Sequence, residues 1–195
     1  MATDRTDHDG ASPDTAAPRS ASARPVVQRP RPAVIVLLVA VAAVVAAADQ
    51  LAKAWALTAL PEGVRTPVLG DLLAFQRVAN SGAAFSLASG STWIFSIIAA
   101  AVVVFLVWFA RRIRSVAWSV LFGLLLGGTT GNLIDRLTRA PGFGVGEVVD
   151  FIRIPLLPAI FNLADTAIVT SMCLFVLLTL LGRGLDGGRR PARED

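Results

Sequence analysis

Histidine and cysteine are almost absent from the sequence. The only histidine is His8, the only cysteine is Cys173, and there is no tyrosine. A histidine-activated nucleophile needs a Ser-His or Cys-His pair, and a zinc site needs several clustered nitrogen, sulfur or oxygen ligands. His8 lies in a polar N-terminal segment, and Cys173 lies among apolar residues, where it is expected to act as a small hydrophobic side chain. We therefore expect neither a serine or cysteine nucleophile nor a metal site.

The sequence also lacks the glycine-rich motifs that bind phosphates. The segment 142–146 is rich in glycine, but no helix pattern follows it, as such a motif would require. No repeat of about 20–50 residues is visible, so solenoids and inverted-repeat transporters have no support. The net charge is +4, yet no basic stripe interleaves with aromatic residues. We expect no cofactor and no nucleic-acid partner.

Long apolar runs are what the sequence has in excess. Hydrophobic residues make up 54% of the chain and charged residues 16%, and the mean hydropathy is +0.65. These values lie beyond those of an ordinary soluble domain. A helix needs about 20 apolar residues to cross a bilayer, and the segments that satisfy this are 33–60, 92–110, 115–134 and 161–182. The fold class is therefore an α-helical membrane protein with four transmembrane helices.

The positions of the arginines predict the orientation of these spans. Five arginines precede residue 33, three lie at 111, 112 and 114 between the second and third spans, and four follow the last span. Cytoplasmic flanks carry the positive excess in membrane proteins. Both chain ends are therefore predicted to be cytoplasmic, with the segments 61–91 and 135–160 outside.

The remaining segments are short. Residues 1–32 have no apolar periodicity and are predicted to form a disordered cytoplasmic tail, and residues 183–195 a short solvated one. The first apolar segment begins too late and runs too long for a cleavable signal peptide, so residues 33–182 are expected to form a single four-span membrane domain. Between the first two spans, short apolar runs broken by Gly70 and Asp71 predict a small extracytoplasmic β-sheet. Residues 148–157 are expected to be partly extended.

The polar side chains within or beside the spans map to their outer half. They are Asp49, Lys53, Asn80, Asn132, Asp135, Arg136, Asp150, Arg153, Asn162 and Asp165. Asp49 and Lys53 lie four residues apart on one helix face, so we expect them to pair and neutralise two costly charges. The glycines at 127, 128 and 131 give the third span a small face for close helix packing. Asp135 either caps that packing motif with an ion pair or has a functional role.

Asp150 and Asp165 are the strongest functional candidates, because a carboxyl group at the edge of the hydrocarbon layer is costly to keep there. Pro155 and Pro158 return the chain toward the last span, so the two carboxyls are expected to meet. Repulsion and desolvation would then raise one pKa, and the pair would share a proton. One member would take a proton from water while the other polarises a carbonyl, which hydrolyses a peptide bond without a covalent intermediate. Alternatively, Asp165 merely complements the dipole of its helix.

Five short motifs lie in order along the spans. They are Asp49-Gln50-Leu51-Ala52-Lys53, Asn80-Ser81-Gly82-Ala83-Ala84-Phe85, Gly127-Gly128-Thr129-Thr130-Gly131-Asn132-Leu133-Ile134-Asp135-Arg136, Val148-Val149-Asp150-Phe151-Ile152 and Phe161-Asn162-Leu163-Ala164-Asp165-Thr166-Ala167-Ile168. In this order, and on spans of this polarity, they resemble the lipoprotein signal peptidase (signal peptidase II) family over roughly residues 33–182.

The resemblance implies an aspartyl endopeptidase of the bacterial plasma membrane that cuts prolipoproteins just before the diacylglyceryl-modified cysteine. It implies that Asp150 and Asp165 are the catalytic dyad and that the outer sheet is a cradle beside them. Asp49, Lys53 and Asp135 would have structural roles. The substrate site would be lined by Asn80, Asn132, Arg136 and Asn162. The implied partners are lipidated prolipoproteins, membrane lipid and a globomycin-type inhibitor, and a monomer is expected.

Some positions depart from the family pattern. Ala52 replaces a hydroxyl residue that commonly precedes the lysine, Leu157 stands where an aromatic residue often precedes proline, and the stretch 139–147 is longer than expected. A rival interpretation is a small ion-coupled carrier or channel subunit that relays protons or cations through Asp49, Asp135 and Asp165. The inner halves of the spans carry no ionisable side chain, so such a relay would not cross the membrane. A scaffold protein would not require Asp150 and Asp165 to converge.

Overall fold

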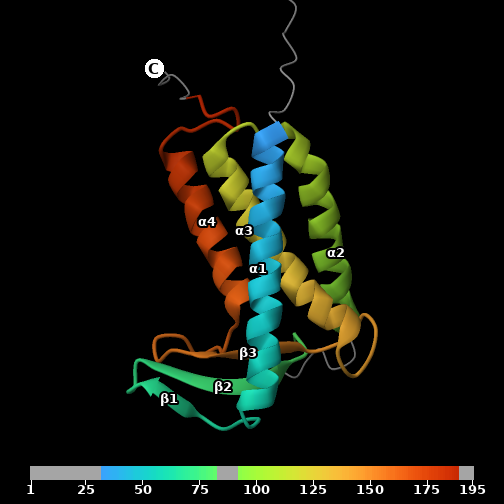
Figure 1. Ribbon diagram of the computed structural model, residues 1–195, viewed down its shortest axis with the longest axis vertical. Helices are drawn as coiled ribbons and strands as arrows, with labels where there is room; N and C mark the ends of the chain where they lie inside the picture. The colour runs from blue at the N-terminus through green and yellow to red at the C-terminus, as the bar shows by residue number, and fades with distance from the viewer. Residues whose placement is uncertain (1–31, 83–91, 189–195) are drawn as a thin grey trace, which may run out of the picture.

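The structure is a computed structural model that describes residues 32–82 and 92–188. The predicted tail at 1–32 falls almost wholly outside the described residues, as do residues 83–85 of the second motif and 189–195 of the C-terminal tail. The elements, in chain order, are α1 (Pro32–Ala59), β1 (Thr66–Leu69), β2 (Leu73–Asn80), α2 (Thr92–Phe109), a short 3-10 turn (Ala110–Arg112), α3 (Val116–Thr138), β3 (Val148–Arg153) and α4 (Leu163–Leu180). Figure 1 shows the helices as a bundle with the sheet at one end.

Four helices are long and apolar enough to cross a membrane, as the composition predicts. Most of their large apolar side chains face outward; on α2, for example, Val104 is 68% exposed and Trp108 is 55% exposed. Exposed apolar surface on this scale is stable against lipid and not against water. At 1.5 Å per residue, α1 is about 42 Å long, which exceeds the hydrocarbon thickness of about 30 Å. Its end therefore extends beyond the bilayer to meet the sheet (Figure 1).

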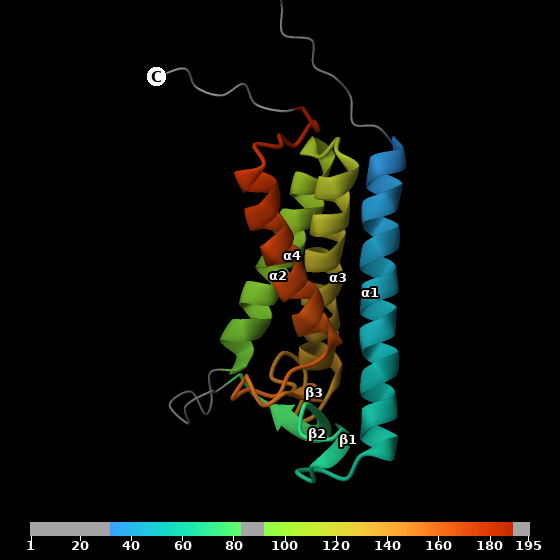
Figure 2. The same cartoon turned by 90° about the vertical axis from the view of Figure 1, so that its left-hand side faces the viewer.

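Helix α3 is the centre of the bundle. It packs against α1, α2 and α4, and α1 also contacts α4; in Figure 2, α1 runs along one side of α3. Glycines make the close approaches possible. A Cβ added at Gly127 would lie 2.6 Å from the carbonyl oxygen of Ala42 on α1, and one at Gly128 would lie 2.5 Å from that of Ala164 on α4. Backbone can approach backbone at these positions only because no side chain intervenes.

The sheet is antiparallel, with strand order β1-β2-β3. Two strands lie between the first two spans, as predicted, and the third comes from the segment between α3 and α4. Trp55 near the end of α1 holds the sheet in place, because its ring lies 5.2 Å from that of Phe75 on β2 and 6.2 Å from that of Phe151 on β3. Edge-on aromatic contacts of this kind add to the burial of apolar area.

The chain after α4 makes specific contacts with the helix bundle. Residues 183–188 fold back onto the turn between α2 and α3, where the backbone N–H of Arg114 donates to the carbonyl of Leu185 at 3.0 Å. The indole N–H of Trp118 donates to the carbonyl of Arg183 at 3.2 Å. Leu185 also packs against the apolar cluster that includes Val34, Trp118 and Leu178.

The close packing at Gly127 gives a test of this architecture. Gly127→Ala is expected to destabilise the fold by roughly 1–3 kcal/mol, because the added methyl group must displace the backbone of α1. The measurement is thermal unfolding of the purified protein in detergent. Gly142→Ala is the matched control, since nothing lies within 4 Å of its added Cβ. Equal unfolding temperatures for the two variants would contradict the packing.

Candidate active site

Asp150 lies in the middle of β3 and is 1% exposed. The β-branched and aromatic residues around it favour a strand, and pairing with β2 places Val78 opposite it. Its carboxylate accepts a hydrogen bond from the side-chain amide of Asn162 at 2.6 Å and another from that of Asn80 at 2.8 Å. Two amides from different elements therefore fix the orientation of this carboxyl group.

Asp165 lies in the first turn of α4 and is half-buried. Asn162 caps the helix, because its side-chain oxygen accepts from the backbone N–H of Asp165 at 2.9 Å. Asp165 completes a capping box by accepting from the backbone N–H of Asn162 at 3.1 Å. Its other oxygen accepts from the side-chain amide of Asn132 at 2.8 Å. The carboxylate thus complements its helix terminus and also faces the third span.

Asn162 connects the two candidate carboxylates. Its side-chain amide donates to Asp150, and its backbone N–H donates to Asp165. Both acids therefore lie against one fully buried asparagine, and the charge of Asp165 acts on Asp150. A water molecule in contact with both carboxyls would be positioned for attack on a carbonyl carbon, which is the geometry that general acid–base hydrolysis requires.

Burial raises the pKa of Asp150 to about 6, and the charge of Asp165 acts in the same direction. The hydrogen bonds from Asn80 and Asn162 stabilise the anion and oppose this rise. Because burial dominates, Asp150 holds a proton more readily than an ordinary aspartate.

A buried ionic cluster stands directly behind the pair. The Lys53 ammonium group contacts Asp49 and Asp135, each at 2.8 Å, and donates to the side-chain oxygen of Asn132 at 2.9 Å. All three charged side chains are 0% exposed. The structure thus contains the expected Asp49–Lys53 pair, and Asp135 adds a second carboxylate. The three protons of the ammonium group match these three acceptors.

Each structural carboxylate also holds the backbone next to one candidate acid. Asp49 accepts from the backbone N–H of Ala164 at 3.0 Å, immediately before Asp165. Asp135 accepts from the backbone N–H of Val149 at 3.2 Å, immediately before Asp150. The cluster therefore joins α1, α3, β3 and α4 at the point where the two acids converge.

Sequence reasoning missed several members of this cluster. Arg139, four residues after Asp135 on α3, donates to the Asp135 carboxylate at 2.6 Å and forms an ion pair with it. Gln50 donates to Asp135 at 3.1 Å and to the carbonyl of Gly131 at 3.0 Å. Helical spacing could have pointed to Arg139, but the predicted third span ended at residue 134 and left it in a loop.

Arg136 and Asn80 lie at the edge of the site. Arg136 is buried, with its guanidinium 5.4 Å from the ring centre of Phe95 on α2. Within the part of the chain that the structure describes, its Nη1 has no hydrogen-bond acceptor. Asn80 is exposed, and its side-chain oxygen accepts from the backbone N–H of Gly82 at 2.8 Å. A polar substrate group near Asp150 would meet both side chains.

The remaining chemistry of the described residues is sparse. No group of three or more His, Cys, Asp or Glu side chains is arranged there to hold a metal ion. The charged side chains of the spans gather at the sheet end, and residues 32–48 of α1, all of α2, 116–134 of α3 and 166–180 of α4 contain no Asp, Glu, Lys, Arg or His. A proton or cation relay through the bilayer would need such groups along its length.

Comparisons with known proteins point to one family. A family model described as signal peptidase (SPase) II matches residues 41–181. A lipoprotein signal peptidase from Leifsonia xyli subsp. xyli (strain CTCB07) is 60% identical over 156 residues, which cover 80% of this chain and 72% of that protein. One from Mycobacterium avium (strain 104) is 44% identical over 159 residues, covering 82% and 87%. A solved structure described as a bacterial membrane enzyme superposes with a TM-score of 0.67 at 28% identity, covering 78% of this chain and 96% of that one.

The ionic cluster predicts a large cost for removing its cation. Lys53→Met is expected to destabilise the fold by roughly 3–5 kcal/mol, because it leaves Asp49 buried without a countercharge and Asp135 with Arg139 alone. Thermal unfolding in detergent is the measurement. Arg65→Met is the control, since it breaks only the exposed pair with Asp71 and should change little. Unaltered stability of the Lys53 variant would show that the cluster does not hold the bundle together.

The raised pKa of Asp150 predicts a specific dependence of stability on pH. The folded protein binds this proton more tightly than the unfolded chain, so the stabilising contribution is full below about pH 4 and is lost as pH rises through about 6. Asp150→Asn lacks this contribution. The unfolding temperature of the wild type is therefore expected to fall relative to that of the variant between about pH 4 and 7.

Asp71→Asn, which alters an exposed carboxyl, is the matched control for this titration. Its unfolding temperature should follow the wild type across the same range. If the difference between wild type and Asp150→Asn stays constant with pH, Asp150 has an ordinary pKa in the folded protein.

Proposed function

We propose, from the premise that the chain belongs to the signal peptidase II family, that Asp150 and Asp165 are the catalytic pair of this membrane protease. The protein is an aspartyl endopeptidase that removes signal peptides from diacylglyceryl-modified bacterial prolipoproteins. The single observation that carries the residue assignment is the position of Asn162, which hydrogen-bonds both acids at once.

The two acids differ in environment, which suggests different roles. Asp150 is the more buried, and burial raises its pKa to about 6. We assign it the proton that polarises the scissile carbonyl. Asp165 would then take a proton from water, and the resulting hydroxide would add to the carbonyl carbon as Asp150 transfers its proton to the oxygen. This division follows the rule that paired titratable groups with different environments take opposite roles.

The second half of the reaction reverses these transfers. The C–N bond of the tetrahedral intermediate breaks, the amine nitrogen receives the proton held by Asp165, and one hydroxyl of the intermediate returns its proton to Asp150. The enzyme ends in its starting state, and one water molecule has been consumed. No covalent intermediate forms, which agrees with the scarcity of histidine and cysteine in the chain.

The substrate-binding roles of Asn80, Asn132, Arg136 and Asn162 belong to the same proposal. The unpartnered Nη1 of Arg136 is suited to donate a hydrogen bond to a carbonyl or other oxygen of the substrate beside Asp150. Asn132 and Asn162 orient the acids by the hydrogen bonds described above. A globomycin-type inhibitor is expected to occupy this same site and to exclude the substrate from it.

The orientation of the protein is proposed from its arginines. Arg111, Arg112 and Arg114 lie in the turn between α2 and α3, at the end of the bundle opposite the sheet (Figure 1). The positive excess supports a cytoplasmic location for that end and for both termini. The catalytic pair then lies at the extracytoplasmic face, where lipidated precursors arrive. A monomer suffices, because one chain supplies both acids and the partners that orient them.

Replacement of either acid tests the assignment. Asp150→Asn and Asp165→Asn are each expected to lower the rate of cleavage of a lipidated precursor in detergent by at least about 10²-fold, the usual contribution of a general acid or base. Glu62→Gln, which alters an exposed carboxyl near the sheet, is the matched control and should retain activity. Thermal unfolding must show that all variants remain folded. Wild-type cleavage by either folded Asp variant would refute the catalytic roles.

A further inference from the structure

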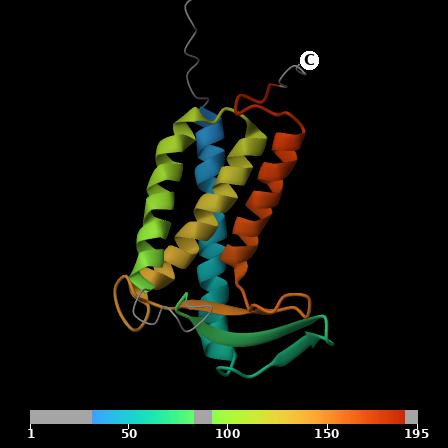
Figure 3. The same cartoon turned by 180° about the vertical axis from the view of Figure 1, so that it is seen from behind.

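A groove runs along the bundle at the end remote from Asp150 and Asp165. Helices α2 and α4 both pack on α3 but have little direct contact with each other, and Figure 3 shows α3 between them. The space between the three helices forms a cavity of about 410 Å³. Every side chain that lines it is apolar, including Phe105, Leu125 and Met172. Its volume lies in the range of roughly 300–1,000 Å³ that is typical of ligand sites.

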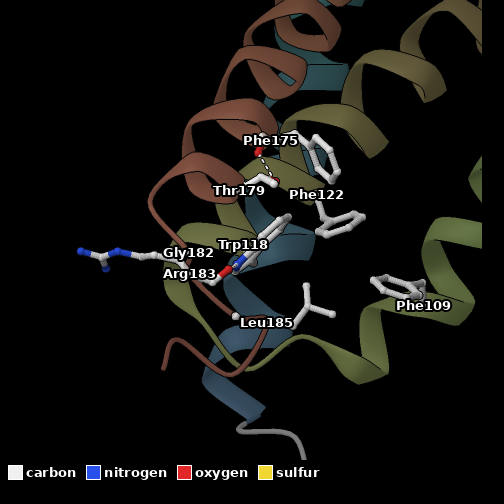
Figure 4. Close-up of a pocket in the computed structure, with 9 residues that line it drawn as sticks. Phe109, Trp118, Phe122, Phe175, Thr179, Gly182, Arg183 and Leu185 are labelled. Atoms are coloured by element: carbon white, nitrogen blue, oxygen red, sulfur yellow. Dashed lines mark hydrogen bonds between the residues drawn. The ribbon is translucent and has the colours of Figure 1, made fainter. Parts of the chain in front are cut away.

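This apolar cavity continues into a second one that contains polar groups. The second cavity has a volume of about 260 Å³ and shares Phe109, Phe122 and Phe175 with the first. Trp118, Thr179 and residues 182–185 complete its wall. Figure 4 shows the aromatic rings around the open space and the Arg183 side chain extending away from it. We call the two cavities together the inner groove. Its interior is apolar, and a cation stands at its mouth.

Positive charge surrounds the mouth of the inner groove. Residues 110–115 and 181–188 contain four arginines and one carboxylate, Asp186. The Arg112 guanidinium lies 4.5 Å from the ring centre of Trp108 and 5.7 Å from that of Phe109, a residue that lines the groove. Neither Arg112 nor Arg183 forms a salt bridge within residues 32–82 and 92–188. Arg112 therefore lies on the α2 side of the mouth without a carboxylate partner among these residues, and Arg183 follows α4 with its side chain directed outward, also without one.

The occupant must match an apolar interior and a cationic mouth. A signal peptide has a basic N-terminal region, which the arginines would repel. A second protein copy would bring the same arginines to the mouth. A phospholipid with an anionic headgroup satisfies both conditions, because its acyl chain can enter between the helices while its phosphate contacts guanidinium groups. Basic pockets between transmembrane helices bind anionic lipid headgroups in this way.

We propose that the inner groove binds an anionic phospholipid, with one acyl chain against Phe109, Trp118, Phe122 and Phe175 and the phosphate at the mouth beside Arg112, where the exposed Arg183 side chain reaches it after a change of rotamer. The bound lipid fills the gap that α2 and α4 leave on α3. This site is separate from the catalytic pair, because none of its lining residues belongs to the sheet or to the first turn of α4, where Asp150 and Asp165 lie. Its occupant is a resident lipid and not a substrate.

Fluorescence quenching of Trp118 tests the proposal directly. The other three tryptophans, Trp55, Trp93 and Trp108, are partly exposed and are replaced by Phe, which leaves Trp118 as the only tryptophan emitter. Phe keeps an aromatic ring against the sheet at position 55 and beside Arg112 at position 108. This protein is placed in phosphatidylcholine vesicles that contain increasing mole fractions of phosphatidylglycerol with brominated acyl chains. Half-maximal quenching is expected at about fivefold lower mole fraction than with brominated phosphatidylcholine, because only the anionic headgroup gains the contacts with arginine. Unbrominated phosphatidylglycerol should reverse the quenching.

Charge variants separate the site from bulk attraction of anionic lipid. Arg112→Gln with Arg183→Gln is expected to abolish the preference for phosphatidylglycerol. Arg65→Gln with Arg153→Gln removes the same charge at the opposite end and should preserve it. Identical curves for the two lipids would overturn the proposal, as would an unchanged preference in the first double variant. Two further outcomes would also overturn the proposal. Reversal of the quenching by a synthetic prolipoprotein signal peptide alone would assign the groove to the substrate. Quenching that falls as protein density rises would assign it to a second copy of the chain.

Discussion

The ammonium group of Lys53, shared between two carboxylates in a site closed to water, is the interaction on which the rest of the structure depends. Lys53 is the only lysine in the chain, and its three contacts come from Asp49 on its own helix and from Asp135 and Asn132 on α3. Such a cluster adds little net stability over a well-packed apolar core. The cluster instead fixes the positions of neighbouring groups, because a carboxylate held by Lys53 can also accept a hydrogen bond from a backbone N–H. The two backbone groups fixed in this way are the immediate neighbours of the two catalytic candidates.

Neutral amides, and not cations, make the direct contacts with those two acids. Asn80 and Asn162 donate to Asp150, and Asn132 donates to Asp165. A guanidinium in the same place would hold an aspartate ionised and suppress proton exchange. An amide orients a carboxyl group with a smaller bias toward the anion. Lys53 forms no ion pair with either acid, and the side chain of Asn132 lies between its ammonium group and Asp165. Among the described residues, the site therefore fixes the geometry of the two carboxyls without a direct cationic partner.

Much of this arrangement follows from sequence patterns that are local. The span lengths follow from apolar runs, and the Asp49–Lys53 pair follows from helical spacing. Contacts across the fold were less accessible. The pairing of β3 with β2 joins segments about 70 residues apart, and no local pattern encodes that register. The extra length of α3 beyond residue 134 was missed because its last turn is polar, and with it the contact from Arg139 to Asp135. Hydrophobicity alone marks where a helix leaves the membrane and not where it ends.

The capping box at the start of α4 gives Asp165 a structural role in addition to its proposed catalytic one. Asp165 closes the first turn of the helix with the same oxygen atoms that would receive a proton from water. In the proposed mechanism, each catalytic cycle would therefore remove and then restore the charge at a helix terminus. Ala164, held from the neighbouring helix by Asp49, keeps that terminus anchored while its own cap is temporarily neutral. The carboxylate that caps α4 would thus also be the base of the reaction. Asp49 on α1, which takes no part in the proton transfers, would keep the first turn of α4 from unwinding.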